Sequence, residues 1–136
     1  MIKVRLTDGA FVPKRAHEFD AGLDLCTPVD FIVPQQGSAT IDTGVAVEIP
    51  EGYVGFLKSK SGLNVHMDLV GEGVIDSGYT GTIKVKLYNH GYTPHWFKRG
   101  NRIIQLVIVP CLLDECMEVD YFHGDRGDNG FGSTGR

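Results

Sequence analysis

Short runs in which every second residue is apolar recur along almost the whole chain, and they limit the folds open to it. Such alternation places the apolar side chains on one face of a β-strand. Turn-forming triplets such as Asp42-Thr43-Gly44 and Asn89-His90-Gly91 separate the runs. Many short strands at this spacing predict an all-β sandwich or barrel. The alternating runs lie at residues 2–6, 31–33, 45–49, 54–56, 83–87 and 104–108.

One segment departs from the strand pattern. Residues 61–67 predict a turn or two of helix, and Ser61 is placed to cap its start. No other stretch leaves room for parallel β/α units. The 136 residues contain no internal repeat or linker, and this indicates a single domain.

Charge and cysteine content exclude several classes of protein. The formal net charge of -4 argues against binding to a nucleic-acid backbone, which needs a basic face. Cys26, Cys111 and Cys116 form no Cys-x-x-Cys pair, so neither a disulfide framework nor a zinc site is expected. The chain shows no signal peptide and no apolar run of the ~20 residues that span a bilayer. We expect a cytoplasmic protein that binds neither nucleic acid nor membranes.

The C-terminal segment from residue 126 is rich in glycine and carries groups that bind phosphate. Phe131 is its only large apolar side chain, so burial cannot repay the entropy of ordering it. Bare glycine N–H groups, hydroxyls and guanidinium groups all bind anions. Composition leaves two interpretations open, an unstructured terminus or a tail that orders on a nucleotide. The polar side chains concerned are Arg126, Ser133, Thr134 and Arg136.

Two carboxylates stand out from their surroundings. Residues 71–81 have glycines at both ends and predict a hairpin, in which Asp76 is a candidate general base and Tyr79 a flat, rigid surface. The alternative is a simple turn. Asp24 lies in the apolar run Ala21-Gly22-Leu23-Asp24-Leu25, where a lone carboxylate is also compatible with a turn or a strand edge.

Two polar clusters are candidates for phosphate contact. Residues 58–63 join hydroxyls, ammonium groups and a glycine at a predicted strand-to-helix junction, and helix N-termini attract phosphate. A solvated charge run with a capping serine explains the same residues. Arg102 and Gln105 lie at the entrance of a strand, where a structural salt bridge by Arg102 is the alternative to ligand contact.

Taken in order, five segments resemble the five motifs of the trimeric dUTPases. The match runs from about residue 20 to the end of the chain. The resemblance implies a β jelly roll, or distorted barrel, that forms a homotrimer with sites at subunit interfaces. It also implies hydrolysis of dUTP to dUMP and pyrophosphate with Mg²⁺, which limits uracil in DNA and supplies dUMP for dTMP synthesis. The segments are Ala21–Leu25, Lys60–Leu63, Gly73–Gly81, Gly100–Leu106 and Arg126–Gly135.

The resemblance further implies a role for each site residue. Asp24 holds hydrated Mg²⁺, Asp76 deprotonates the water that attacks the α-phosphorus, and Tyr79 packs on C2′ and excludes UTP. Residues 1–123 form the core, and residues 124–136 form a flexible lid. The remaining implied contacts are Lys60, Ser61, Gly62 and Gln105 for phosphates, the backbone around Val70, Gly73, Val74 and Ile75 for uracil, and Arg126, Phe131, Gly132, Ser133 and Thr134 for base and phosphates.

The chain departs from the family pattern at a few positions. Lys60 replaces the usual arginine of the second motif and lacks its planar, bidentate fork. Asn101 and Ile104 replace an acidic residue and an alanine of the fourth. Three alternatives stay open: a dCTP deaminase of the same fold, a dUTPase-like trimer that regulates a protein partner, and a structural jelly-roll subunit.

Overall fold

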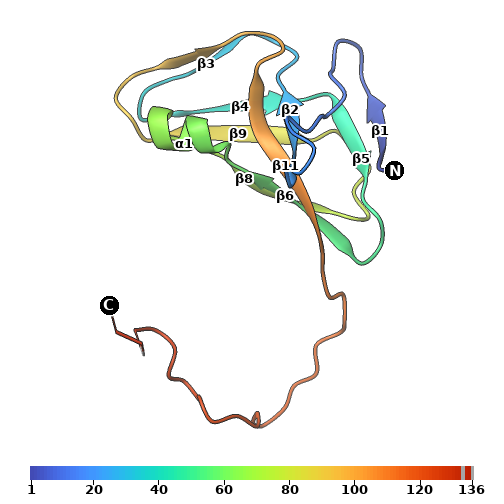
Figure 1. The fold of residues 1–136 in the computed structure, drawn as a ribbon, viewed down its shortest axis with the longest axis vertical. Coiled ribbons are helices and arrows are strands. Elements are labelled where there is room, and N and C mark those ends of the chain that lie inside the picture. The colour runs from blue at the N-terminus through green and yellow to red at the C-terminus, as the bar shows by residue number, and fades with distance from the viewer. Residues whose placement is uncertain (133, 136) are drawn as a thin grey trace.

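The computed structural model describes residues 1–132 and 134–135, and it consists of β-strands with one short helix. Figure 1 shows a folded body from which the C-terminal segment leads away. Every run of alternating apolar residues contains a strand, so the all-β prediction is confirmed. The elements are β1 (Lys3–Leu6), β2 (Gly22–Cys26), β3 (Phe31–Val33), β4 (Ser38–Asp42), β5 (Val45–Glu48), β6 (Tyr53–Lys58), α1 (Ser61–Met67), β7 (Leu69–Val70), β8 (Glu72–Asp76), β9 (Lys84–Asn89), β10 (His95–Phe97) and β11 (Arg102–Pro110).

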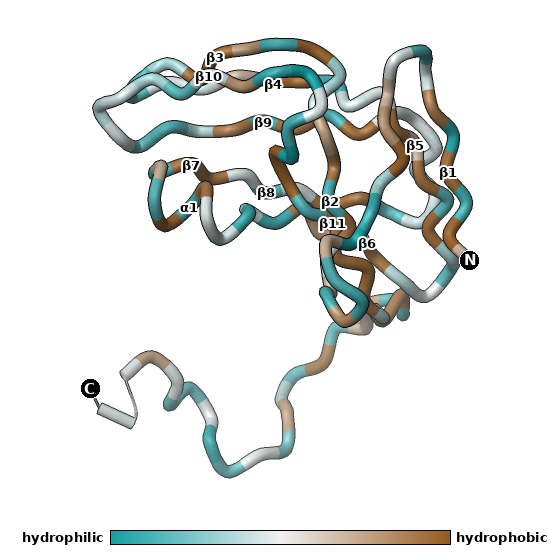
Figure 2. Tube along the Cα trace, turned by 45° about the horizontal axis from the view of Figure 1, so that its top comes forward, coloured by the Kyte–Doolittle hydropathy of each residue, from teal (hydrophilic) through white to brown (hydrophobic). Residues whose placement is uncertain are grey.

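Two sheets form most of the body. One has the strand order β2-β11-β6-β8 and the other β4-β9-β7, with antiparallel pairing throughout. Two further pairs, β1 with β5 and β10 with β3, flank them. Among the described residues the sheets do not close into a barrel. Figure 2 shows the apolar residues concentrated on the strands of the body. The buried core includes Leu25, Leu57, Ile75 and Leu106 from the first sheet and Ile41, Leu69, Val85 and Leu87 from the second.

The six alternating runs contain none of β2, β4, β7, β8 and β10, and β4 and β10 illustrate why. In β4 the outward residues are Ser38, Thr40 and Asp42, and only Ala39 and Ile41 face inward. Such a short apolar pair does not stand out as alternation. β10 has three residues, too few to show a period. Both strands exist because they pair with other strands, β4 with β9 and β10 with β3.

Three of the turns between strands contain a glycine with positive φ. The values are 68° for Gly44, 81° for Gly52 and 88° for Gly100. Residues with a Cβ rarely adopt this conformation. Glycine therefore allows the chain to reverse between the short strands at these points.

The predicted helix occurs, but its predicted cap was wrong. Lys60 is the N-cap residue, with φ −73° and ψ 130°, and no side-chain hydrogen bond caps the helix. Ser61 already has helical geometry, because the helix begins at that residue. Its hydroxyl is therefore not used by the helix.

Residues 71–81 do not form the predicted hairpin. β8 pairs with β6, whereas the short β7 pairs with β9 in the other sheet. The chain passes between the two sheets at Gly71, where a Cβ would lie 2.5 Å from Cδ1 of Ile104. The glycine is thus required by close packing at a crossing between sheets.

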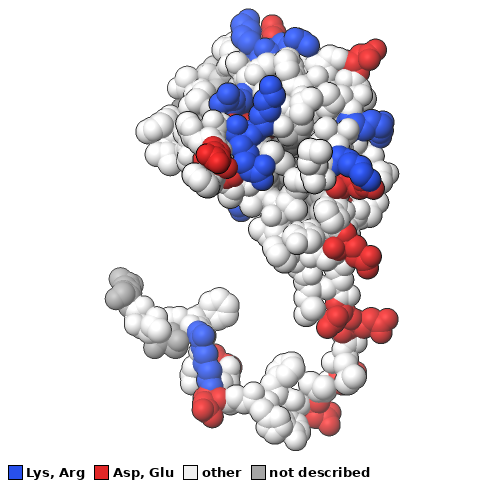
Figure 3. All heavy atoms as spheres, turned by 45° about the vertical axis from the view of Figure 1, so that its right-hand side comes forward, with Lys and Arg blue, Asp and Glu red and all other residues white. Residues whose placement is uncertain are grey.

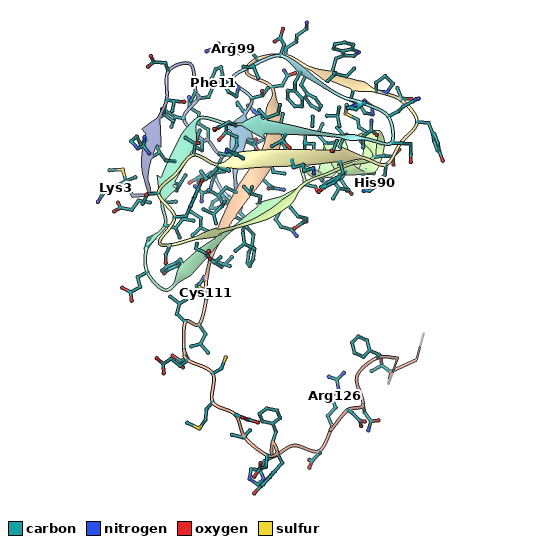
Figure 4. All side chains as sticks on the ribbon, turned by 180° about the vertical axis from the view of Figure 1, so that it is seen from behind. Lys3, Phe11, His90, Arg99, Cys111 and Arg126 are labelled. Carbon is teal, nitrogen blue, oxygen red and sulfur yellow. The ribbon has the colours of Figure 1, made fainter. Side chains whose placement is uncertain are left out.

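The C-terminal segment leaves the body at the end of β11. The N–H of Cys111 donates to the carbonyl of Gly52 at 2.9 Å. Every described residue from Leu112 onward is exposed. In Figure 4, Cys111 lies where the ribbon leaves the body and Arg126 lies far along the segment. The exposed segment includes residues 112–123 as well as the described residues of the predicted lid.

All three cysteines, each within the described residues, are free. No helix in the described part of the chain is long and apolar enough to cross a membrane.

Candidate functional site

A pocket of about 220 Å³ opens beside Asp24. Several residues that the sequence predicted for metal or phosphate contact line it together. They come from distant parts of the sequence, and the fold alone brings them to one place. The lining residues are Ala16, Asp20, Gly22, Asp24, Lys60, Ser61, Gly62 and Gln105.

Strand register explains this convergence. Gln105 of β11 lies directly opposite Asp24 of β2 on one side and Lys58 of β6 on the other. Directly paired residues of neighbouring strands project to the same face of a sheet. β6 ends at Lys58, so the loop that begins α1 carries Lys60 and Ser61 over the same end of the sheet.

Asp24 is the buried charge of this pocket. Its side chain is only 8% exposed, and Oδ1 accepts a hydrogen bond from Nζ of Lys60 at 2.5 Å. Nε of Arg102 lies 3.7 Å from Oδ2, which is consistent with the salt bridge considered for that residue. Oδ2 has no hydrogen-bond partner among the described residues. A buried carboxylate oxygen without a partner is costly, and it is suited to a water molecule or a hydrated cation.

Gln105 is held at the pocket by Ser59 and Gly22, and no sequence pattern predicted its contact with Gly22. Its Nε2 donates to the carbonyl of Ser59 at 3.0 Å. Its side chain lies against Gly22, and a Cβ on that glycine would collide with Oε1 of Gln105. Gly22 therefore makes room for the amide. Nothing in the sequence pattern signals this, because the two residues meet only across the sheet.

Asp76 and Tyr79 form a second cluster, on one turn after β8. The N–H of Tyr79 donates to the carbonyl of Asp76 at 3.0 Å, so the two residues begin and end the same turn. Both side chains are exposed. Among the described residues, the Asp76 carboxylate takes part in no hydrogen bond or ion pair. The turn thus presents a free carboxylate beside an aromatic ring.

The two clusters lie far apart in one chain. Asp24 lies opposite Gln105 of β11, whereas Asp76 aligns, through β6, with Val109 of the same strand. Four residues of strand cover about 13 Å, and three strand spacings cover about 14 Å. Both carboxylates project from one face of the sheet, on the order of 20 Å from each other. One chain therefore does not bring Asp24 and Asp76 to the same ligand.

The predicted uracil-binding residues lie on β7 and β8. β8 is an edge strand, because only β6 pairs with it within the described residues. Its outer edge presents backbone N–H and C=O groups that no other strand uses. Val74 is exposed, whereas Ile75 is buried in the core and can reach a ligand only through its backbone. Gly73 and Val70 are half-buried.

The predicted lid residues lie away from both clusters. Phe131 is fully exposed, and Arg126, Gly132 and Thr134 are exposed. The predicted contact of Ser133 falls outside the described residues. Nε of Arg126 donates to the carbonyl of Asn129 at 2.5 Å, which closes a small local turn. Figure 3 shows Lys and Arg gathered on the body, and acidic side chains where the exposed segment begins.

Cys26, at the end of β2, lines a neighbouring pocket together with Asp24 and Arg102. Burial raises the pKa of the Cys26 thiol, and the Arg102 guanidinium opposes this in part. A thiol whose pKa is raised stays neutral and unreactive near neutral pH.

Comparison with known proteins gives a consistent result. A family model described as dUTPase matches residues 8–135. The deoxyuridine 5'-triphosphate nucleotidohydrolase of Mycobacterium marinum is 43% identical over 97% of this chain and 92% of its own length. The dUTPase of Staphylococcus bacteriophage 80alpha, solved with dUPNHPP, has a TM-score of 0.89 and 35% identity, covering 100% of this chain and 99% of that one. A point mutant of the dUTPase from phage phi11 of S. aureus, described with a structural Mg(II) ion, has a TM-score of 0.84 and 33% identity, covering 90% of this chain and 98% of that one.

Proposed function

The chain belongs to the dUTPase family, and from that premise we propose that it hydrolyses dUTP to dUMP and pyrophosphate at sites built from more than one copy of itself. One observation carries the second half of this proposal. Asp24 and Asp76 lie on one face of the sheet but on the order of 20 Å apart. Two carboxylates at this separation in one chain cannot both act at the same reacting phosphorus. A homotrimer places the Asp76 turn of one copy against the Asp24 pocket of the next.

The Asp24 pocket takes the phosphates. Lys60 supplies an ammonium group, and Ser61 and Gly62 add a hydroxyl and a backbone N–H at the same rim. Gln105 contributes its amide from the strand below. Donors fixed in place before the ligand arrives stabilise a developing charge without reorganisation during the reaction.

The same pocket fits a divalent cation. Oδ2 of Asp24, which has no hydrogen-bond partner among the described residues, is an oxygen ligand of the kind that Mg²⁺ prefers, directly or through water. When bound, Mg²⁺ would neutralise part of the negative charge of the phosphates. Asp24 would hold the hydrated ion, and Lys60 must then share or release the carboxylate.

The Asp76 turn supplies the base and the sugar contact. The exposed carboxylate orients and deprotonates the water that attacks the α-phosphorus in line. Tyr79 covers C2′ and leaves no space for a ribose hydroxyl. The free edge of β8 offers alternating N–H and C=O groups to the polar edge of uracil. A base with the wrong donor pattern leaves buried groups unpaired, which discriminates strongly.

The exposed C-terminal segment completes the site. Leu112, Leu113, Met117, Tyr121 and Phe122 are all exposed along it. Apolar side chains in such a row favour contact with another copy. Residues 124–136 then act as a lid, in which Phe131 stacks on the base and Arg126 with the hydroxyl residues contacts phosphate.

Co-expression of two inactive variants tests the shared site. Asp24→Asn and Asp76→Asn each lack one half, so each alone should release almost no pyrophosphate from dUTP. In randomly mixed trimers about a quarter of the sites combine the intact Asp76 of one copy with the intact Asp24 of the next. Recovery near that level is expected. An inactive mixture that contains mixed trimers would place both carboxylates in one chain's site and overturn the proposal.

The proposed cellular role is to limit uracil in DNA and to supply dUMP for dTMP synthesis. The three free cysteines favour a reducing compartment such as the cytosol. Incubation with dCTP and assay for ammonia separates this activity from deamination. Substantial release of ammonia would contradict the assignment.

A further inference from the structure

The ring of Tyr79 lies directly over the backbone of Gly81. A Cβ on Gly81 would lie 2.6 Å from Oη of Tyr79 and 2.8 Å from its Cζ. Both distances are shorter than any packed carbon contact. The place taken by the end of the ring is therefore available only because residue 81 has no side chain.

Backbone geometry does not explain the glycine. Neither Gly78 nor Gly81 has φ in the left-handed region, so an alanine is compatible with the main chain at both positions. The two glycines flank Tyr79 but differ in their surroundings. A Cβ on Gly78 would meet no atom within 4 Å, whereas a Cβ on Gly81 would meet the ring.

A second contact fixes the same end of the ring. Oη of Tyr79 donates to the carbonyl of Thr82 at 2.7 Å. Oγ1 of Thr82 in turn donates to Oδ2 of Asp42, at the end of β4, at 3.0 Å. The phenol is thus tied to the three-stranded sheet, although the tyrosine is 44% exposed. The backbone of Tyr79 is tied to Asp76 through the turn.

We propose that Gly81 is a positioning residue for sugar selection, which holds the Tyr79 ring where it covers C2′ of the nucleotide. This inference rests on the proposed role of Tyr79. A methyl group at residue 81 displaces the exposed end of a side chain and not the backbone. The fold and its stability are therefore retained while the ring moves, and the space for a ribose hydroxyl opens.

The test compares Gly81→Ala with the matched control Gly78→Ala, and the measured quantity is kcat/KM for UTP divided by kcat/KM for dUTP. Gly81→Ala should raise this ratio about 10-fold, the scale of discrimination by shape alone. Gly78→Ala should leave it at the wild-type value. Because Tyr79→Phe removes the closest colliding atom, the effects of Tyr79→Phe and Gly81→Ala should be non-additive in the double variant.

The variant Tyr79→Ala distinguishes a failure of the role proposed for Tyr79 from a failure of the role proposed for Gly81. An unchanged ratio in Tyr79→Ala would refute the proposed role of Tyr79 itself. A raised ratio in Tyr79→Ala, with Gly81→Ala indistinguishable from Gly78→Ala, would overturn the positioning role alone.

If Gly81→Ala lowers the unfolding temperature, the variant Thr82→Val tests the position of the ring instead, because it removes the hydrogen bond that ties Thr82 to Asp42. A smaller rise in the ratio supports the proposal, and no rise contradicts it.

Discussion

The Asp24 pocket and the Asp76 turn carry the same functional group in opposite environments. Asp24 is buried and lies against two cations, Lys60 and Arg102. Asp76 is exposed and unpaired within the described residues. A buried carboxylate must have its partners in place when the chain folds, because an isolated buried charge is prohibitively costly. The chain therefore completes the Asp24 pocket alone, whereas in the proposed trimer the Asp76 turn stays open until another copy covers it.

Asp76→Asn and Asp24→Asn should separate catalysis from stability. Asp76→Asn should bind dUTP but lose at least ~10² in kcat, as removal of a general base does, with unchanged thermal unfolding. Asp24→Asn should lose activity and also about 1–3 kcal/mol of unfolding free energy, because Lys60 keeps its charge without its partner. Steady-state kinetics and chemical denaturation measure both. Equal unfolding curves for the two variants would contradict the proposed difference between the buried Asp24 and the exposed Asp76.

Deletion of residues 124–136 tests whether the Asp24 pocket and the Asp76 turn are sufficient for activity without the proposed lid. Ordering about ten residues costs on the order of 10 kcal/mol, whereas stacking Phe131 on a base returns only ~1–3. Phosphate contacts must supply most of the remainder. The truncated protein should keep its fold and its oligomeric mass but lose most turnover. Circular dichroism, light scattering and pyrophosphate release check this, and a fully active truncation would leave the lid without a function.

The variants Lys60→Met and Lys58→Met compare two nearby lysines whose ion-pair partners differ in burial. Lys60 pairs with a buried carboxylate inside the pocket, whereas Lys58 pairs with the exposed Glu72 at 2.9 Å. Loss of a charge-assisted contact at Lys60 should weaken inhibition by pyrophosphate about 10-fold, and Lys60→Arg should restore it. Lys58→Met should change it little, because exposed ion pairs contribute little. Equal effects would mean that general charge, and not the pocket, binds phosphate.

The alternation of apolar residues was a reliable guide because each strand has one face on the core. It failed for β4 and β10, whose polar outer faces and short length hide any period. The predicted cap at Ser61 was wrong because Ser61 is itself the first residue of α1, so that Lys60 is the N-cap residue. The predicted hairpin at residues 71–81 was wrong because β8 pairs across the chain with β6. Strand partners depend on distant residues that local patterns do not contain.

By itself, the sequence determined the all-β class, six of the strands and the residue types of the two clusters, because these features depend on short local segments. Only the tertiary structure decided where those segments meet. It placed Asp24, Lys60 and Gln105 in one pocket and Asp76 and Tyr79 at the far end of the same face. It also gave Gly22 and Gly81 their roles as spaces for Gln105 and Tyr79. Register and close packing are relations between residues distant in the chain, and they exist only once the core has formed.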